Sequence, residues 1–121
     1  MSVVFRYTGG ELINNGMTGK RNIEDSEKAK IVAETAKIPW TDLQRWFASG
    51  SAIYVAGDLD LIEVAWQMSQ DNKRAVAQWM ESGQVGLVSD QQAVDWLKED
   101  ALLWAAVIKP WVLVQLVPAE Q

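Results

Sequence analysis

The chain has no histidine and no cysteine among its 121 residues. Histidine is the side chain that titrates near neutral pH, and the cysteine thiolate is a common nucleophile and metal ligand. Their absence excludes disulfide bonds and most imidazole, thiolate and transition-metal chemistry. We therefore expect no cofactor and no resident metal. The composition disfavours an enzyme, although Ser, Thr, Lys, Tyr and carboxylate side chains leave that class open.

Familiar catalytic motifs are missing as well. The chain has no G-x-S-x-G sequence, no Walker loop and no G-x-G-x-x-G sequence, and Ser49-Gly50-Ser51 is better explained as a helix end. Lys109 stands in a strongly apolar stretch, where burial would lower its pKa and favour a role as base or nucleophile. The alternative is an exposed lysine in a turn between two strands. We predict no catalytic residues.

Positive charge is scarce, since 11 Lys and Arg residues stand against 16 Asp and Glu residues and give a net charge of −5. Proteins that bind a nucleic-acid backbone do so through Lys and Arg side chains that displace counterions from the phosphates. A chain with this charge balance is not expected to bind nucleic acid.

Long uninterrupted apolar runs are also lacking. Residues 101–117 form the most apolar stretch, but Lys109-Pro110 interrupts it. A lysine in the middle of a bilayer costs about 2.5–3.5 kcal/mol. We therefore predict two strands covered on both faces, 102–108 and 111–117, joined by a turn at Lys109-Pro110, with one kinked strand as the alternative. The first residues show no export signal, so we expect a cytoplasmic protein without a membrane segment.

Seven tryptophans and an apolar content of 49% are ample for a core in a chain of this length. Residues 1–24 are polar, glycine-containing and without a period, which predicts a flexible N-terminal tail before a single globular domain over 25–121. The fold class we expect is α+β, possibly α/β. It would have about five helices packed on a small mixed sheet of three to four strands.

Helical spacing and turn signals place the elements of this domain. Strands are predicted at 52–56 and 85–88, and helices are expected to end at Pro39, Gly50 and Gly83. The residues expected to cap helices are Ser26, Thr41, Asp60, Asp71 and Ser89, the last in a capping box with Gln92. The apolar residues expected to face inward are Ala29, Val32, Ala33, Ala36, Leu43, Trp46, Phe47, Leu61, Val64, Ala65, Met68, Val76, Trp79, Met80, Ala93, Trp96 and Leu97.

Two stretches of the chain read alike, each with a tryptophan, a Ser-Gly helix end and a strand, at 46–56 and 79–88. The two helices between their strands leave room for a parallel crossover. Ligands of parallel sheets bind where strands end and helices begin, which here means the loops 57–60 and 89–90. Both loops are acidic, so a cation or an amine would be the guest.

Asp58, Asp60 and Glu63 offer oxygen ligands for Mg²⁺ or Ca²⁺, although their spacing is not that of an EF-hand. The alternative is that Asp60 caps a helix and Glu63 completes its capping box.

Most of the tryptophans fall inside predicted elements and are expected to fill the core. Trp66 lies off the inward stripe of its helix, which makes it the best candidate for contact with a partner, because tryptophan is enriched at binding hot spots. Trp40 follows Pro39 and could fix the angle between the first two helices.

Several segments resemble one known family. They are Glu34-Thr35-Ala36-Lys37-Ile38-Pro39-Trp40, Leu59-Asp60-Leu61-Ile62-Glu63-Val64-Ala65, Trp79 with Ser82-Gly83-Gln84-Val85, and Lys109-Pro110-Trp111-Val112-Leu113-Val114-Gln115. The resemblance is to the bacterial domain of unknown function 2288, over about residues 26–115, with the Pro-Trp-Val-Leu-Val-Gln ending as its most specific part. It implies a bacterial and cytoplasmic protein, and it implies no activity and no catalytic residues.

The function we expect is that of a small non-catalytic interaction or adaptor domain. It would present a Trp-containing apolar patch, rimmed by carboxylates, to another protein or to a second copy. The alternative is a small-ligand or divalent-cation binding protein, or an enzyme, that uses the loops 57–60 and 89–90. The residues that we expect to contact a ligand or partner are Trp66, Asp58, Asp60, Glu63, Ser89 and Asp90.

Overall fold

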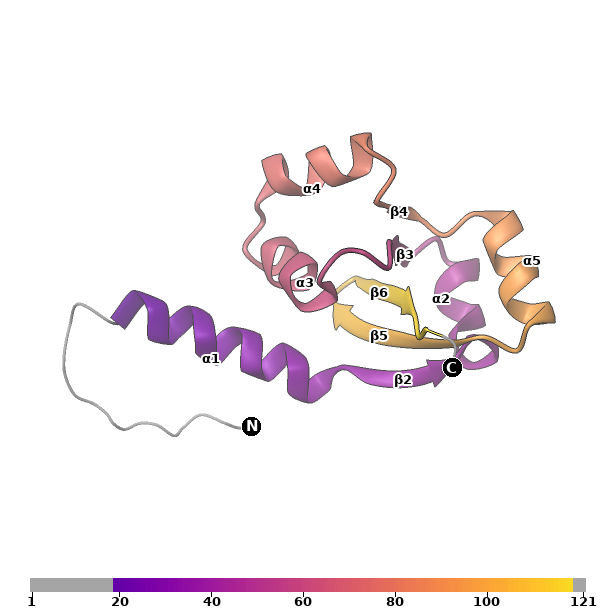
Figure 1. Ribbon diagram of the computed structural model, residues 1–121, viewed down its shortest axis with the longest axis horizontal. Coiled ribbons are helices and arrows are strands. Elements are labelled where there is room, and N and C mark those ends of the chain that lie inside the picture. The colour runs from indigo at the N-terminus through magenta and orange to yellow at the C-terminus, as the bar shows by residue number, and fades with distance from the viewer. Residues whose placement is uncertain (1–18, 119–121) are drawn as a thin grey trace.

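A mixed sheet of five strands lies at the centre of the molecule (Figure 1). The computed structural model describes residues 19–118. The strands are β2 (Ala36–Pro39), β3 (Ala52–Val55), β4 (Val85–Leu87), β5 (Leu102–Ile108) and β6 (Trp111–Leu116). The helices are α1 (Gly19–Glu34), the 3-10 helix η3 (Trp40–Leu43), α2 (Gln44–Ala48), α3 (Leu61–Ser69), α4 (Lys73–Glu81) and α5 (Asp90–Lys98). The single α+β domain of the sequence prediction is confirmed, with one strand more than expected.

The strand order across the sheet is β2-β5-β6-β3-β4. Only β3 and β6 run parallel, with Ala52 opposite Val112, while the other neighbours are antiparallel. Strands β5 and β6 form the hairpin that the sequence predicts, with its turn at Lys109-Pro110. Lys109 is exposed at this turn, so the burial that would make it a base or nucleophile is not present.

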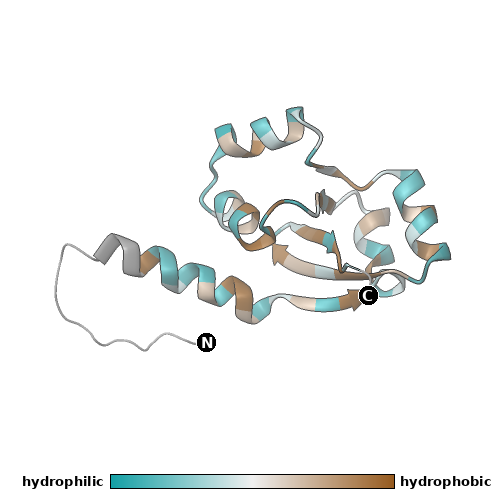
Figure 2. Ribbon diagram, viewed as in Figure 1, coloured by the Kyte–Doolittle hydropathy of each residue, from teal (hydrophilic) through white to brown (hydrophobic). Residues whose placement is uncertain are grey.

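Apolar side chains fill both faces of the sheet. On one face Trp40 and Trp96 meet edge to face, their ring centroids 5.0 Å apart, against Leu103, Ala105 and Val112 from the strands. On the other face the side chains of α1, α3 and α4 lie over the alternate strand residues, among them Ala106 and Leu113. Apolar residues on both sides of β5 and β6 explain their near-continuous apolar sequences, as predicted (Figure 2).

The two Ser-Gly helix ends have the same geometry. Gly50 has φ 76° and Gly83 has φ 83°, the left-handed conformation that favours glycine. The amide of Ser51 donates to the Trp46 carbonyl at 2.8 Å, and the amide of Gln84 donates to the Trp79 carbonyl at 2.9 Å. This long backward hydrogen bond and a left-handed residue define a Schellman helix end, which the sequence located correctly at both places.

The expected parallel pairing of the strands 52–56 and 85–88 is wrong. Strands β3 and β4 are antiparallel, with Ile53 opposite Leu87 and Val55 opposite Val85. The two helices between them bring the chain back to the same end of β3 at which it left, where the Ala56 amide donates to the Gln84 carbonyl at 2.8 Å. The parallel neighbour of β3 is β6, which comes last in the chain.

The N-terminal part of the fold also differs from expectation. Helix α1 ends at Glu34 rather than at Pro39, and 36–39 form strand β2 at the edge of the sheet, where proline is tolerated. Ser26 lies inside α1 and caps nothing. The expected inward stripe is exposed, and Ile31 is the buried side chain, because α1 turns its other face to α3. Of the predicted tail 1–24, residues 1–18 lie outside the described part, and α1 already includes 19–24.

Smaller corrections concern helix starts and inward residues. Asn72 caps α4 in place of Asp71, and Thr41 lies inside η3 rather than before a helix. Met80 and Leu97 were expected inside, but each is 53% exposed. Within residues 19–118, no helix has the length and apolar character needed to cross a membrane.

Candidate functional site

The two acidic loops do not form one site. Asp58 and Asp60 follow β3 at one end of the sheet, whereas Ser89 and Asp90 follow β4 at the other end, beside the start of β3. The Asp60 carboxylate caps α3 by accepting from the Ile62 and Glu63 amides at 2.9 and 3.4 Å. Ser89 and Gln92 form the predicted capping box of α5. Both loops therefore cap the helices that follow them, as their sequences predict. The expected capping box of Asp60 with Glu63 does not form, because the Glu63 carboxylate accepts from Lys28 and Gln67 instead.

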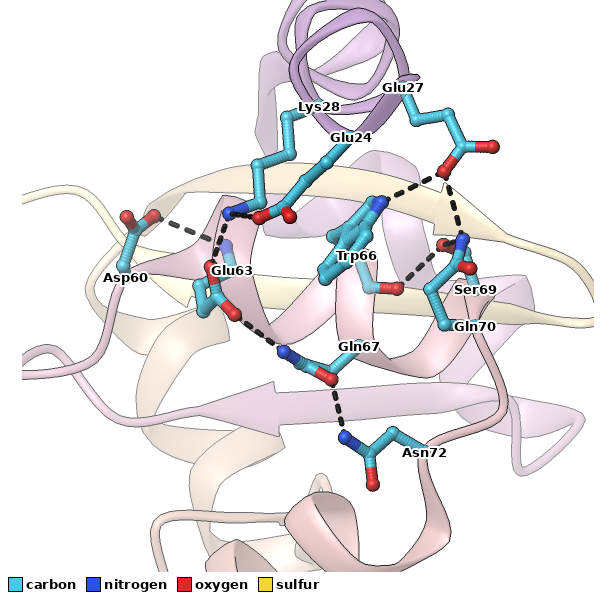
Figure 3. Close-up of polar contacts among 10 residues, drawn as sticks. All are labelled: Glu24, Glu27, Lys28, Asp60, Glu63, Trp66, Gln67, Ser69, Gln70 and Asn72. Atoms are coloured by element: carbon cyan, nitrogen blue, oxygen red, sulfur yellow. Dashed lines mark hydrogen bonds and ion pairs between the residues drawn. The ribbon is translucent and has the colours of Figure 1, made fainter. Parts of the chain in front are cut away.

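Glu63 belongs to a polar network that fastens α1 to α3 (Figure 3). Its carboxylate accepts from the Lys28 ammonium at 2.7 Å and from the Gln67 amide at 2.7 Å. The Lys28 hydrogen bond, followed by that of Gln67, lowers the pKa of Glu63, and the same pairing raises the pKa of Lys28. Lys28 also pairs with Glu24 at 2.9 Å. Residues 19–118 contain no group of three ligands placed to hold a metal ion.

Trp66 is half-buried where α3 meets α1. Its indole Nε1 donates to the Glu27 carboxylate at 3.0 Å, and the Lys28 ammonium lies 5.0 Å from the ring centroid (Figure 3). The carboxylate beside the Trp66 indole is thus that of Glu27, in α1 of the same chain. A contact between Trp66 and a partner stays a prediction.

The carboxyl ends of the parallel strands β3 and β6 do meet. The Gln115 side chain of β6 donates at 2.8 Å to each of the Ala56 and Leu59 carbonyls, which holds the loop after β3 in place. A hollow of about 320 Å³ lies there. Its polar groups are already engaged, because Gln115 holds this loop, Asp60 caps α3 and the Thr35 hydroxyl donates to Ile31.

A larger groove lies between α4 and the turn that joins β5 to β6. We call it the α4 groove. Its volume is about 380 Å³, which is at the lower end of ligand pockets. Its lining is mostly apolar and includes Trp111, which directly follows Pro110 at the turn. The lining residues are Met68, Asp71, Asn72, Lys73, Val76, Ala77, Met80, Ile108, Lys109 and Trp111.

Helix α4 has an apolar face but buries none of its side chains, among the residues that the structure describes. Val76 and Trp79 are half-buried, and Met80 is 53% exposed. The helix contacts α3 and β4 and does not lie over the centre of the sheet (Figure 1). The groove therefore combines apolar surface with the polar side chains of Asp71, Asn72, Lys73 and Lys109.

Sequence reasoning missed this groove because it assigned Val76 and Met80 to the core on helical spacing alone. No pattern in the amino-acid sequence shows that the apolar face of α4 lies beyond the sheet. The one weak signal for the groove is Trp111, because it follows a turn that the sequence places at the end of the hairpin.

Comparison with known proteins agrees with the fold and adds no activity. The solution NMR structure of PA1075 from Pseudomonas aeruginosa is similar, with 36% identity and a TM-score of 0.69, over 89% of this chain and 97% of that chain. No curated protein matches. A family model described as "Protein of unknown function (DUF2288)" matches residues 26–116. The chain therefore belongs to the DUF2288 family, as its Pro-Trp-Val-Leu-Val-Gln ending and helix starts led us to expect.

Proposed function

We propose that this protein is a non-catalytic interaction domain and that a partner protein docks in the α4 groove. One observation carries the proposal: the apolar face of α4 is only partly covered, since Trp79 packs against the core while Met80 is 53% exposed, and this face borders a groove with Trp111 in its wall. Association of a partner with this apolar surface is favourable, because water is expelled from it. In this proposal the Trp-containing patch that we expected from the sequence is that of Trp111 rather than that of Trp66.

The chemistry of the groove supports a protein guest. Met68 and Met80 have flexible, polarisable side chains that adapt to different shapes, and methionine is over-used at binding surfaces. Trp111 supplies a rigid apolar wall, and tryptophan contributes strongly at the centre of interfaces. An aromatic or aliphatic side chain of a partner would fill the space between α4 and the hairpin turn.

The alternative of a small ligand or divalent cation at the acidic loops has less support. Its two loops lie at opposite ends of β4, and Glu63 is engaged by Lys28 rather than free to ligate. Ser89 and Asp60 already cap helices. We keep Asp58, Asp60, Glu63, Ser89 and Asp90 as structural residues in this proposal.

The experiment is affinity capture of the tagged protein from its native cells, with two matched variants. Met80→Glu places a charge in the α4 groove, and Leu97→Glu places one on α5, away from the groove, at a position with the same 53% exposure. A stoichiometric partner should be lost with Met80→Glu and kept with Leu97→Glu. A partner that Met80→Glu retains, but that a folded Trp66→Ala variant loses, would place the docking surface at α1 and α3 instead.

We also propose that the protein acts in the bacterial cytoplasm. The absence of cysteine supports this location, because the protein needs no disulfide bond and hence no oxidising compartment. Fractionation of the native cells, with detection of the protein in the soluble cytoplasmic fraction, would test it, and recovery from the periplasm or from membranes would contradict it.

A further inference from the structure

The α4 groove carries positive charge on an acidic protein. Lys73 and Lys109 line it together with a single carboxylate, Asp71, so the lining has a net charge of +1, whereas the chain has −5. The two lysines come from different elements, Lys73 from the first turn of α4 and Lys109 from the turn between β5 and β6. The groove is therefore an apolar space with an amine on each of its two sides.

These amines are available to a guest. Among the side chains that the structure describes, residues 23–118, the ion pairs are those of Lys28 with Glu24 and Glu63, so no carboxylate in this range pairs with Lys73 or Lys109. Both side chains belong to exposed residues. The neighbouring Asn72 is occupied, since its side chain accepts from the Ala75 amide and donates to Gln67. A carboxylate on a partner protein would therefore pair with both ammonium groups without displacing an existing ion pair.

We propose that the α4 groove binds an acidic amphipathic segment of a partner protein, in which an Asp or Glu stands close to an aromatic or aliphatic residue. This inference rests on the proposed function and names the chemistry of the partner. The apolar side chain enters between Met80 and Trp111, and the carboxylate lies between Lys73 and Lys109. Electrostatic complementarity of this kind selects partners and speeds their encounter.

Charge also decides which occupant fits. A basic segment would be attracted to the acidic remainder of the protein and repelled by the two lysines, so it would not be directed to the groove. A second copy of this chain would bring a further body of net charge −5 against the first, and the two would repel. An acidic segment of a different protein meets a local match inside the groove, where two lysines stand beside apolar surface.

The experiment selects peptides from a displayed random library in parallel on the native protein, on Met80→Glu and on Lys73→Glu/Lys109→Glu. The native protein should enrich peptides with Asp or Glu within one helical turn of an aromatic or aliphatic residue. The double variant should enrich Lys or Arg at those positions, and Met80→Glu should enrich neither set. Leu97→Glu is the matched control and should select as the native protein does.

A selected acidic peptide is then synthesised and titrated against each protein. Reversal of both lysines removes two attractions and introduces two repulsions, so it should weaken binding by about tenfold. Binding to the native protein should fall as salt is raised, because both amines are at the surface. The Gln analogue of the peptide should bind less tightly than the Glu form and should show little dependence on salt.

Contradictory outcomes separate the two proposals. Peptides that are enriched on the native protein, lost on Met80→Glu and neutral or basic in composition would overturn the acidic segment and leave the groove as the docking site. Selection that is the same on the native protein and on Met80→Glu would overturn the groove itself. A native protein that sediments as a dimer, and as a monomer after Met80→Glu, would make a second copy the occupant. Tighter binding of decanoate than of any selected peptide would replace the protein segment by a free organic anion.

Discussion

Helices α3 and α4 follow one another in the chain, have nine residues each and are each capped by a side chain, yet the molecule uses them differently. Helix α3 buries Leu61, Val64 and Ala65, whereas α4 buries none of its side chains. Both show apolar residues at helical spacing. The comparison teaches that an apolar stripe at helical spacing does not by itself show how far the helix is buried, since the rest of the fold covers α3 more fully than α4.

The difference arises from what lies beneath each helix. Helix α3 contacts β5 and β6 at the centre of the sheet on one side and α1 on the other. Helix α4 contacts α3 and β4, and β4 is a strand of only three residues at the edge of the sheet. The sheet is too narrow at this edge to cover a second helix, so the apolar face of α4 borders a groove.

The largest expected effect is the difference in how much α3 and α4 contribute to the free energy of unfolding. Leu61→Ala removes a buried side chain of α3 and leaves a cavity, so it should lower the free energy of unfolding by about 2–5 kcal/mol. Val76→Ala on α4 should lower it by less than about 1 kcal/mol, because this residue is only half-buried. Urea unfolding of both variants measures the difference. Equal losses would show that α4 is part of the core.

Removal of the helix caps compares α3 and α4 again, with smaller expected losses of stability. Asp60→Ala removes the acceptor of two amides of α3 and should cost about 1 kcal/mol of global stability. Asn72→Ala removes one amide partner of α4 and should mainly speed hydrogen exchange within 73–81, with a smaller change in global unfolding. If Asn72→Ala destabilised the whole domain as much as Asp60→Ala, the two helices would be equally integrated.

The pairing of α3 with α1 predicts a pH dependence. Folding lowers the pKa of Glu63 through Lys28, so its contribution to stability is present above its ordinary value of 4.5 and is lost as the pH falls through the lower folded value. When the pH falls from about 6 to about 3, the free energy of unfolding of Glu63→Gln should therefore decrease less than that of the native protein. The difference between the two decreases should be at most about 1 kcal/mol, because the pair is partly exposed. Unfolding curves at several pH values measure this. Glu81→Gln on α4 is the control and should follow the native protein.

The smallest expected change in stability is that of Met80→Glu. Its side chain is 53% exposed, so the free energy of unfolding should change by no more than about 0.5 kcal/mol, although partner binding is lost. Urea unfolding beside the capture experiment checks both. A loss of several kcal/mol would mean that Met80 supports the fold, and the loss of a partner would then report unfolding rather than docking.

Local signals in the sequence predicted local structure well. Gly50 and Gly83 end helices as expected, Asp60 and Ser89 cap them, and Lys109-Pro110 turns the hairpin. Such features depend on one turn of backbone and its own side chains, which the sequence contains directly.

Long-range relations were not predicted. The pairing of β3 with β6 joins strands far apart in the chain, and no pattern in either strand specifies its neighbour. Strand β2 was missed because 36–39 ends in proline and continues a helical pattern, and its strand form depends on pairing with β5. The α4 groove was missed for the same reason, since whether Val76 and Met80 are covered depends on where the sheet ends.

The most direct test of the docking surface is an NMR titration of the isotopically labelled protein with 8-anilinonaphthalene-1-sulfonate, an apolar aromatic anion of the chemistry that the groove fits. We predict shifts of the backbone amides of residues that line the α4 groove, and none in α1 or α5; the lining amides are those of Lys73, Val76, Ala77, Met80, Ile108, Lys109 and Trp111. Shifts centred on Trp66 and α1, shifts centred on Trp104 and Gln115, or no shifts at all, would contradict the assignment of the docking surface to α4.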